Sequence, residues 1–491
     1  MTMKKIKKAA AGLAALSMVL GLTACGEKNT GSGESAETTA QVTTTTAATV
    51  EKNTETLNEE AQADIDNTSD KLKEDELENK TIKWLAHYDP FNPSSSGNSK
   101  AVSLSYFETK YGGNIEWYPT TWDNRYNDLS TYVLGGEGVD FFPCDTAALP
   151  KGVISSMFQP VDEYINLDDD LWKTVSDAME IYNFAGRHYE FVTGVSAEQV
   201  VLYSHKTIEE NGLDDPTELW EKGEWNWDTF KKILMDYVDF DNSCYGLDGF
   251  WAEKALFLSA GVPAVSTTED GHLKTNLMDP TVEKAMNFEY DLFNNGLVID
   301  RSLFDWSEQP QFMSEGKELF YIVGSWHIGA APETWATKMD PTDVRMVPVP
   351  SPADSDRNWQ SATLDGWCLC KGAANPKGVA RFAECVLLSN SDEKAIEIND
   401  QKYRDDYGWS DELIETNKKI NEIARQNPVV DLATGVSADV ASITTDGGDQ
   451  IGLRAALHGY DWATNRETIA GVVEQLVQEA DDKITAMSSA S

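Results

Sequence analysis

Aromatic and acidic side chains are the groups in this sequence that could recognise a ligand. The chain has 491 residues, of which 15 are Trp, 17 are Tyr and 82 are Asp or Glu. Several Trp residues sit beside turns rather than inside apolar runs. Aromatic rings pack against the apolar C–H faces of sugars, and carboxylates bind the hydroxyl groups around the rim. This supply of residues therefore points to carbohydrate binding, a chemistry that requires no fixed spacing.

The first cluster of this kind follows a short apolar run. Thr81–Ala86 has the composition of a strand, and His87, Tyr88 and Asp89 come directly after it. In open α/β sheets the carboxyl ends of the strands face the ligand crevice. We therefore expect these three side chains to lie at a binding crevice.

Other chemistries lack their motifs. The six His never approach the spacing of a zinc site, and neither a phosphate-binding loop nor a nucleophile elbow occurs. Asp239–Ser243 begins like a calcium loop but lacks the required Gly, so we interpret it as a solvated acidic turn. We expect no metal and no cofactor. A pair of carboxylates at the separation used by glycosidases remains an open alternative.

Alternating elements after Thr81 indicate the fold class. Helical spacing over 100–111 and 126–134 alternates with strand-like runs at 115–118 and 139–142. Strand–helix–strand order predicts an α/β fold with a parallel sheet. At 491 residues the chain is too long for one ordinary domain.

A segment in the middle of the chain could connect two such domains. Tyr189–Val192 and Val200–Tyr203 both read as strands, and the polar stretch Thr193–Gln199 between them carries Glu198. The two strands could form a hairpin. Alternatively, the chain crosses here from one lobe to another, and the polar stretch lines the crevice between the lobes.

The order of short motifs along the chain resembles the bacterial extracellular solute-binding proteins of the maltose-binding-protein-like group. Two positions depart from the group's pattern, because Val139 stands where it usually has Pro, and Ser204–His205 replaces an Asn. The resemblance extends over roughly Thr81 to Ala486. It is carried by Met157–Tyr164, Val201–Lys206, Asn211–Leu213, Trp227–Phe230, Phe312–Phe320, Gly324–Trp326, Val347–Pro352 and Asn375–Ala383.

This resemblance implies a two-lobed periplasmic-binding-protein-like fold, type II, in which each lobe is a mostly parallel sheet flanked by helices. Ligand would bind in the cleft as the lobes close about hinge crossovers. The crossovers would fall at Thr193–Gln199, near Ser361–Asp365 and within Pro428–Ser442. The first lobe would comprise residues 80–195 and 365–432, and the second lobe residues 196–364 and 433–488.

The resemblance also suggests further ligand contacts. It implies that Trp326 and Trp251 face the ligand, that Trp367 and Glu198 lie at crossovers lining the cleft, and that Asp145 joins the polar contacts. Four other Trp residues are expected to be structural: Trp122, Trp225, Trp227 and Trp306.

The N-terminus has the pattern of a lipoprotein signal. A basic start is followed by an apolar run too short to span a bilayer, and Leu22–Cys25 resembles a bacterial lipobox. We expect cleavage after residue 24 and diacylation of Cys25, which would anchor the protein on the extracellular face of the cytoplasmic membrane. Residues 25–80 are expected to form a disordered Thr- and Glu-rich tether.

Charge and cysteine content narrow the partners. A formal charge of −42 disfavours nucleic acid and anionic lipid surfaces. The five cysteines after Cys25 are irregularly spaced and give no disulfide framework. The leading hypothesis is therefore a monomeric, non-enzymatic, substrate-binding lipoprotein that delivers an oligosaccharide to an ABC permease. A surface glycan-binding lipoprotein without transport, or a glycoside hydrolase, is the alternative.

Overall fold

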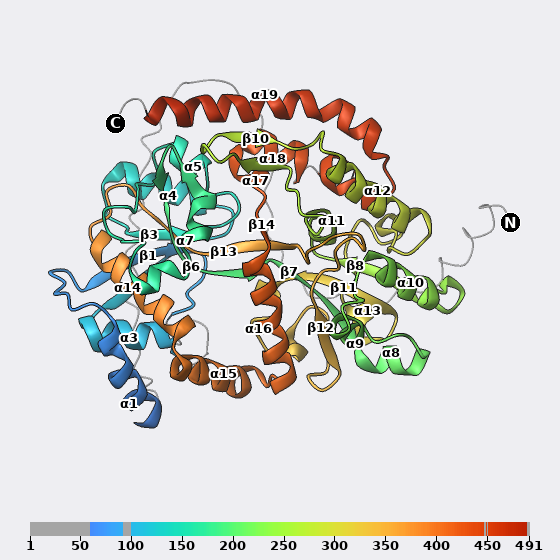
Figure 1. The fold of residues 1–491 in the computed structure, drawn as a ribbon, viewed down its shortest axis with the longest axis horizontal. Helices are drawn as coiled ribbons and strands as arrows, with labels where there is room; N and C mark the ends of the chain where they lie inside the picture. The colour runs from blue at the N-terminus through green and yellow to red at the C-terminus, as the bar shows by residue number, and fades with distance from the viewer. Residues whose placement is uncertain (1–58, 92–99, 446–447, 449, 489–491) are drawn as a thin grey trace, which may run out of the picture. The chain divides into compact units, whose positions relative to one another are not determined.

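The computed structural model describes residues 59–91, 100–445, 448 and 450–488, all within one compact unit (Figure 1). Cys25, the predicted signal and most of the predicted tether lie outside the described residues. Of the helices found in these ranges, none combines the length and the apolar character needed to cross a membrane.

The first lobe is built on a six-stranded sheet with the strand order β14-β13-β3-β1-β2 and with β6 paired to β13. The pairs β1–β2 and β1–β3 are parallel, as the alternation of strands and helices predicts, whereas β13 runs antiparallel to β3 and β6. The strands are β1 Thr81–Ala86, β2 Asn114–Pro119, β3 Phe141–Pro143, β6 Glu190–Ala197, β13 Gln360–Leu369 and β14 Pro428–Val429.

Helices cover this sheet because their apolar positions recur at helical spacing. They include α3 Val102–Tyr111, α4 Arg125–Gly135, α5 Lys151–Ile154, α6 Asp170–Lys173, α7 Ser176–Met179, α14 Pro376–Ser391 and α15 Glu393–Tyr407. Gly112 ends α3 in the left-handed conformation, with φ of 60°, and its N–H bonds back to Glu108. The chain can therefore turn directly into β2.

The second lobe is built on a four-stranded sheet with the order β12-β7-β11-β8. Only the β8–β11 pair is parallel, since β7 runs antiparallel to both of its neighbours, so this sheet is mixed rather than mostly parallel. Its elements are β7 Gln199–Ser204, β8 Tyr245–Gly249, β11 Glu318–Gly324 and β12 Val344–Val347, with helices α8 His205–Asn211, α9 Pro216–Glu221, α10 Trp227–Tyr237, α11 Ala252–Leu258, α12 Pro280–Asn294 and α13 Gln311–Ser314.

The expected crossover between the sheets is confirmed at Glu198. β6 pairs with β13 in the first sheet, and β7 pairs with β11 and β12 in the second, so the two strands do not form a hairpin. The polar stretch is shorter than predicted because β6 continues to Ala197. The predicted second crossover at Ser361–Asp365 lies inside β13, so the chain returns to the first sheet between Val347 and Gln360.

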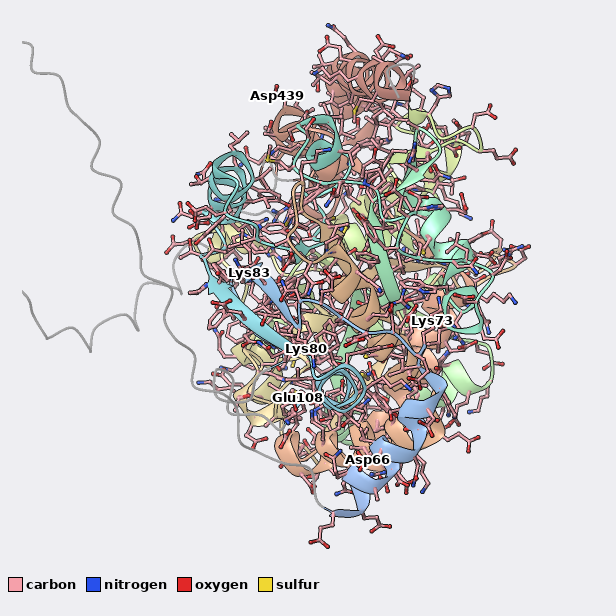
Figure 2. The ribbon with its side chains drawn as sticks, turned by 90° about the vertical axis from the view of Figure 1, so that its left-hand side faces the viewer. Asp66, Lys73, Lys80, Lys83, Glu108 and Asp439 are labelled. Carbon is pink, nitrogen blue, oxygen red and sulfur yellow. The ribbon has the colours of Figure 1, made fainter. Side chains whose placement is uncertain are left out.

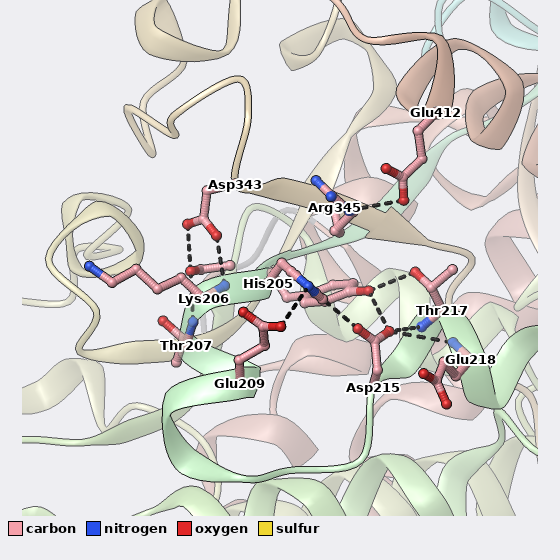
Figure 3. A network of polar contacts seen from close by, with 12 residues as sticks. His205, Lys206, Thr207, Glu209, Asp215, Thr217, Glu218, Asp343, Arg345 and Glu412 are labelled. Carbon is pink, nitrogen blue, oxygen red and sulfur yellow. Dashed lines mark hydrogen bonds and ion pairs between the residues drawn. The ribbon is translucent and has the colours of Figure 1, made fainter.

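Helix α16, Asp411–Gln426, packs against strands of both sheets, with β6, β13 and β14 on one side and β12 on the other. It was expected in the first lobe, yet its buried residues Leu413, Ile414, Ile420 and Ala424 pack in one core cluster with side chains of β7, β11 and β12. Glu412 of α16 also pairs with Arg345 of β12 at 2.9 Å (Figure 3). Figure 3 shows this pair beside the bonds that hold α8 and α9 to the same sheet. The helix therefore bridges the two sheets, and the chain returns to the first sheet after it in β14.

Residues 59–80, expected to be part of the disordered tether, are packed against the first lobe. Helix α1, Glu59–Thr68, which carries the labelled Asp66 in Figure 2, lies against α3. The Thr68 and Tyr106 hydroxyls are 2.6 Å apart. Four apolar side chains of this acidic segment are buried, namely Ala61, Ile65, Leu72 and Leu77. Their burial offsets the cost of ordering the chain, which the overall acidic composition concealed.

The C-terminal part of the chain connects the two halves of the fold. Helices α17 Ala433–Val436 and α18 Ala438–Thr444 precede the long α19 Trp462–Ser488, which contacts α5, α12 and the β9–β10 ribbon (Figure 1). That ribbon pairs Val265–Thr267 with Leu273–Thr275, and a second one pairs Asn183–Phe184 with Arg187–His188.

Candidate functional site

An aromatic group lies at the carboxyl ends of β1 and β2. The His87 ring is 4.8 Å from that of Tyr88 and 5.1 Å from that of Trp122, and half of the Trp122 side chain is exposed. His87 Nδ1 is buried without a hydrogen-bond partner among the described residues. Burial and then the charge of Arg125 lower the pKa of His87, although Asp145 opposes them. The imidazole is therefore neutral at physiological pH.

The Arg125 guanidinium fixes the position of Trp122. Its centre lies 3.5 Å from the centroid of the Trp122 ring, and its Nε donates to Asp145 at 2.7 Å. Asp145 also accepts bonds from the Tyr126 hydroxyl and the Ala147 N–H. Both carboxylate oxygens are thus engaged, and Asp145, predicted as a ligand contact, holds Arg125 in place instead.

Glu198 joins both lobes at the crossover. One carboxylate oxygen accepts from Lys254 of α11 at 2.6 Å, and the other accepts from the Ser361 hydroxyl of β13 at 2.6 Å. Its backbone N–H donates to the Ser361 carbonyl, and its carbonyl accepts from the Ser325 N–H. Glu198 is therefore a fixed residue in the floor of the cleft, with one charged partner.

Trp251 is presented to solvent by a strained turn. It has φ of 60° and is 43% exposed at the start of α11. Gly249 before it has φ of 152°, and a Cβ there would lie 2.0 Å from the Ile322 carbonyl oxygen, so β8 can reach β11 only with Gly at this position. Strained backbone of this kind concentrates at functional sites.

Trp326 lies on the same side of the second lobe. It is 62% exposed in the short helix Ser325–His327 after β11, and its ring lies 6.2 Å from that of Phe250, the neighbour of Trp251. A Cβ on Gly324 would lie 2.1 Å from the Trp326 Nε1 atom. The Gly therefore lets the indole fold back over the backbone while its outer face stays open.

A third charge pair comes from the C-terminal part of the chain. Glu253 of α11 is buried and accepts from Arg454 at 3.1 Å, and it lies 3.3 Å from the His458 ring. Burial alone would raise the pKa of Glu253, but His458 and Arg454 outweigh it and lower the pKa to about 2. The carboxylate is therefore permanently charged and orients Arg454.

Some of these side chains line one pocket of about 200 Å³ in the cleft, and of the predicted ligand contacts only Glu198 and Trp251 are among them. The first lobe contributes Trp122 and Arg125, and the second contributes Trp251 and Lys254, with Glu198 in the floor. Three cationic side chains at the pocket are each paired with one carboxylate. The pocket therefore offers charged donors and acceptors, and these pairs carry no net charge. Exposed indoles beside charge-paired polar groups suit a neutral, hydroxyl-rich ligand with apolar faces.

Six of the eight predicted contacts do not line this pocket, namely His87, Tyr88, Asp89, Asp145, Trp326 and Trp367. Trp367 is only 7% exposed and stacks on Phe382 at 5.3 Å within the core of the first lobe. The buried Asp89 accepts from the Phe91 N–H, so it stabilises the loop after β1. Tyr88, in contrast, is 43% exposed, although desolvation by the surrounding protein together with the charges of Asp145 and Asp365 raises its pKa to about 12.

Three residues that line the pocket were not predicted from the sequence as site residues, namely Trp122, Arg125 and Arg454. Trp122 was expected to be structural, although its position just after a strand could have marked it as a candidate. Arg454 and Glu253 are 201 residues apart, and no local pattern signals their pairing. Among residues 59–91, 100–445, 448 and 450–488, no cluster of metal-ligating side chains occurs.

Comparison with solved structures shows the same fold. An ABC substrate-binding protein from Listeria monocytogenes in complex with cycloalternan is 14% identical, with a TM-score of 0.56 over 83% of this chain and 99% of that chain. An ABC transporter associated binding protein from B. animalis subsp. lactis in complex with beta-1,6-galactobiose is 15% identical, with a TM-score of 0.54 over 81% and 98%. An extracellular solute-binding protein from Staphylococcus aureus in complex with maltose is 13% identical, with a TM-score of 0.53 over 84% and 98%.

No curated protein matches the chain significantly. The family model described as bacterial extracellular solute-binding protein matches residues 104–404, which include most of both sheets and the crossover at Glu198. The chain therefore belongs to the family of bacterial extracellular solute-binding proteins.

Proposed function

We propose that this protein binds a neutral oligosaccharide in the cleft pocket and delivers it to the permease of an ABC importer. The observation that carries the proposal is the pocket itself, in which Trp122 and Trp251 from opposite lobes face a space bordered by charge-paired side chains. The similar structures named above hold a cyclic oligosaccharide, a galactobiose and maltose, which supports a carbohydrate ligand.

In this proposal the protein does no chemistry on its ligand. The charged groups of the pocket are held by one another: Arg125 by Asp145, Lys254 by Glu198 and Arg454 by Glu253. Such groups bind hydroxyls well but are poorly placed to exchange protons. The protein would act as a monomer, with the boundaries of its lobes following the two sheets and with α16 lying between them.

Anchoring through diacylated Cys25 completes the proposal and places the protein on the extracellular face of the membrane. Partitioning of the wild type and Cys25→Ser between detergent and aqueous phases tests it. The wild type should enter the detergent phase, and the variant should remain in water. Detergent partitioning of the variant would contradict lipid attachment at this residue.

Calorimetric titration with neutral oligosaccharides of two to six sugar units tests ligand capture, with chromatography of the sugars afterwards. We expect at least one sugar to bind and to be recovered intact. Recovery of shorter products would instead identify a glycoside hydrolase. Binding without any change in solution scattering would favour a surface glycan-binding protein that does not close for transport.

A further inference from the structure

A second and larger cavity lies beside the hinge strands and shares no lining residue with the cleft pocket. Its volume is about 730 Å³, within the usual range for small-molecule sites. One wall is formed by β6 with the ends of α14 and α15 from the first lobe. The Ser325–Gly329 turn of the second lobe lies opposite, and α16, which packs on both β6 and the core of the second sheet, closes the cavity between them.

Hydroxyl and amide side chains make up most of the polar lining. Two of them are held by the free edge of β6, because Asn390 Nδ2 donates to the Thr193 carbonyl at 3.0 Å and Asn421 Oδ1 accepts from the Ala197 N–H at 3.0 Å. Asn399 and Asn417 also line the cavity. A side-chain amide both donates and accepts hydrogen bonds, as a sugar hydroxyl does.

The charges around the cavity largely neutralise one another. Lys418 of α16 pairs with Asp400 of α15 at 2.6 Å, which links the two walls. Arg425 pairs with Glu422, and Asp365 accepts from the Ser196 hydroxyl at 3.0 Å. Tyr403, whose ring lies 4.8 Å from that of Trp409, adds an aromatic surface. Among the residues that line the cavity, an anionic ligand would therefore find no unpaired cation with which to form a new ion pair.

We propose that this hinge cavity is a second binding site for a neutral, hydroxyl-rich ligand of the size of a trisaccharide, separate from the cleft pocket. This assignment rests on the volume of the cavity, on the amides bound to β6 and on walls that come from both lobes. Because an occupant would contact both lobes, its binding would be linked to the angle between them, and each ligand would change the affinity for the other by the same factor.

The test uses maltotriose, cellotriose and raffinose as probes of the intact protein. Asn417→Trp places an indole in the hinge cavity, and Lys419→Trp places one on the exposed side of the same helix as a matched control. With at least one probe, the wild type and Lys419→Trp should show two binding events in calorimetry. Asn417→Trp should lose one of them, with a Kd at least 100-fold higher.

Two further variants separate folding effects and the two sites. Asn417→Ala, which removes one amide without adding bulk, should weaken the same event about tenfold. Trp251→Ala should weaken only the binding event in the cleft. If the cleft assignment is wrong, Trp251→Ala leaves both events unchanged; if the hinge-cavity assignment is wrong, Asn417→Trp does. Crystals soaked with each probe should show sugar beside Asn390 and Asn421. The proposal is overturned if soaked crystals show sugar only in the cleft or nowhere, or if Asn417→Trp titrates like the wild type.

Discussion

The cleft pocket and the hinge cavity are built by different means, although both adjoin the same hinge strands. In the cleft, ion pairs hold the lining within each lobe and at the crossover: Arg125–Asp145, Lys254–Glu198 and Arg454–Glu253. In the hinge cavity, neutral amides bind the backbone of β6, and one partly exposed pair, Lys418–Asp400, joins the walls.

This difference indicates in which site the side chains keep their geometry when the lobes move. Charged side chains held by partners of their own lobe keep their geometry whatever the angle between the lobes, so the cleft is organised before ligand arrives. The width of both sites changes with that angle, because each has walls from both lobes. In the hinge cavity, however, the pair Lys418–Asp400 and the amides on β6 are the contacts that hold the lining. Substitutions should therefore cost most where a partly buried charge loses its partner and least where only a neutral group is exchanged.

Glu198→Gln should have the largest effect. The substitution leaves Lys254 facing a neutral amide where both side chains are mostly buried. We expect the free energy of unfolding to fall by about 3 kcal/mol, measured by urea denaturation. Glu218→Gln is the matched control, because it removes an exposed pair with Lys222 and should leave the midpoint unchanged. Equal midpoints for the two variants would show that the crossover pair does not stabilise the fold.

Trp251→Ala should have the next largest effect, on ligand affinity. Losing an indole from one wall of the pocket should raise the Kd for the bound sugar roughly 30-fold, about 2 kcal/mol, in a calorimetric titration. Trp306→Ala is a close control, since Trp306 also has φ of 60° and is 45% exposed but does not line the pocket. Similar losses in both variants would mean that backbone strain, not contact with sugar, sets the affinity.

The elements that carry the cleft could be predicted from the sequence because their signals are local. The expected strand at Thr81–Ala86 has the observed bounds, and the two strands around Glu198 occur in separate sheets. The ion pairs could not be predicted, because each joins residues far apart in the chain. Glu198 and Lys254 are separated by 56 residues, and Glu253 and Arg454 by 201.

Trp367 shows how one irregularity in a strand can overturn a prediction of a site residue. Residues two apart in a regular strand face the same side, so Asp365 and Trp367 should point together. The pairing of β13 with β6 shifts register between Asp365 and Gly366, which is a β-bulge. Asp365 consequently lines the hinge cavity while Trp367 packs in the core. Nothing in the local sequence except Gly366 hints at this change.

Asn421→Ala tests the neutral bonds of the hinge cavity. The buried Ala197 N–H would lose its acceptor, so the free energy of unfolding should fall by about 1 kcal/mol in urea denaturation. Asn417→Ala is the control on the same helix, because among the described residues its side chain forms no hydrogen bond, and the variant should be as stable as the wild type. A larger loss for Asn417→Ala would place the stabilising contact elsewhere on α16.

Asp365→Asn should change the free energy of unfolding least at low pH, and its effect should be visible in how that free energy depends on pH. Asp365 is exposed to the hinge cavity, but the protein around it desolvates the carboxylate and raises its pKa to about 6, although the Ser196 hydroxyl lowers it in part. Between pH 4 and 6 the folded state therefore retains a proton that the unfolded state has lost, so stability falls as pH rises through this window. The asparagine variant lacks this slope, and its stability relative to the wild type should grow from pH 4 to pH 7. Ser196→Ala removes the bond that favours the charged form and should steepen the wild-type decline. If the wild type and Asp365→Asn show parallel profiles in urea denaturation, the carboxylate titrates as it would in water, and the hinge cavity is wetter than its lining suggests.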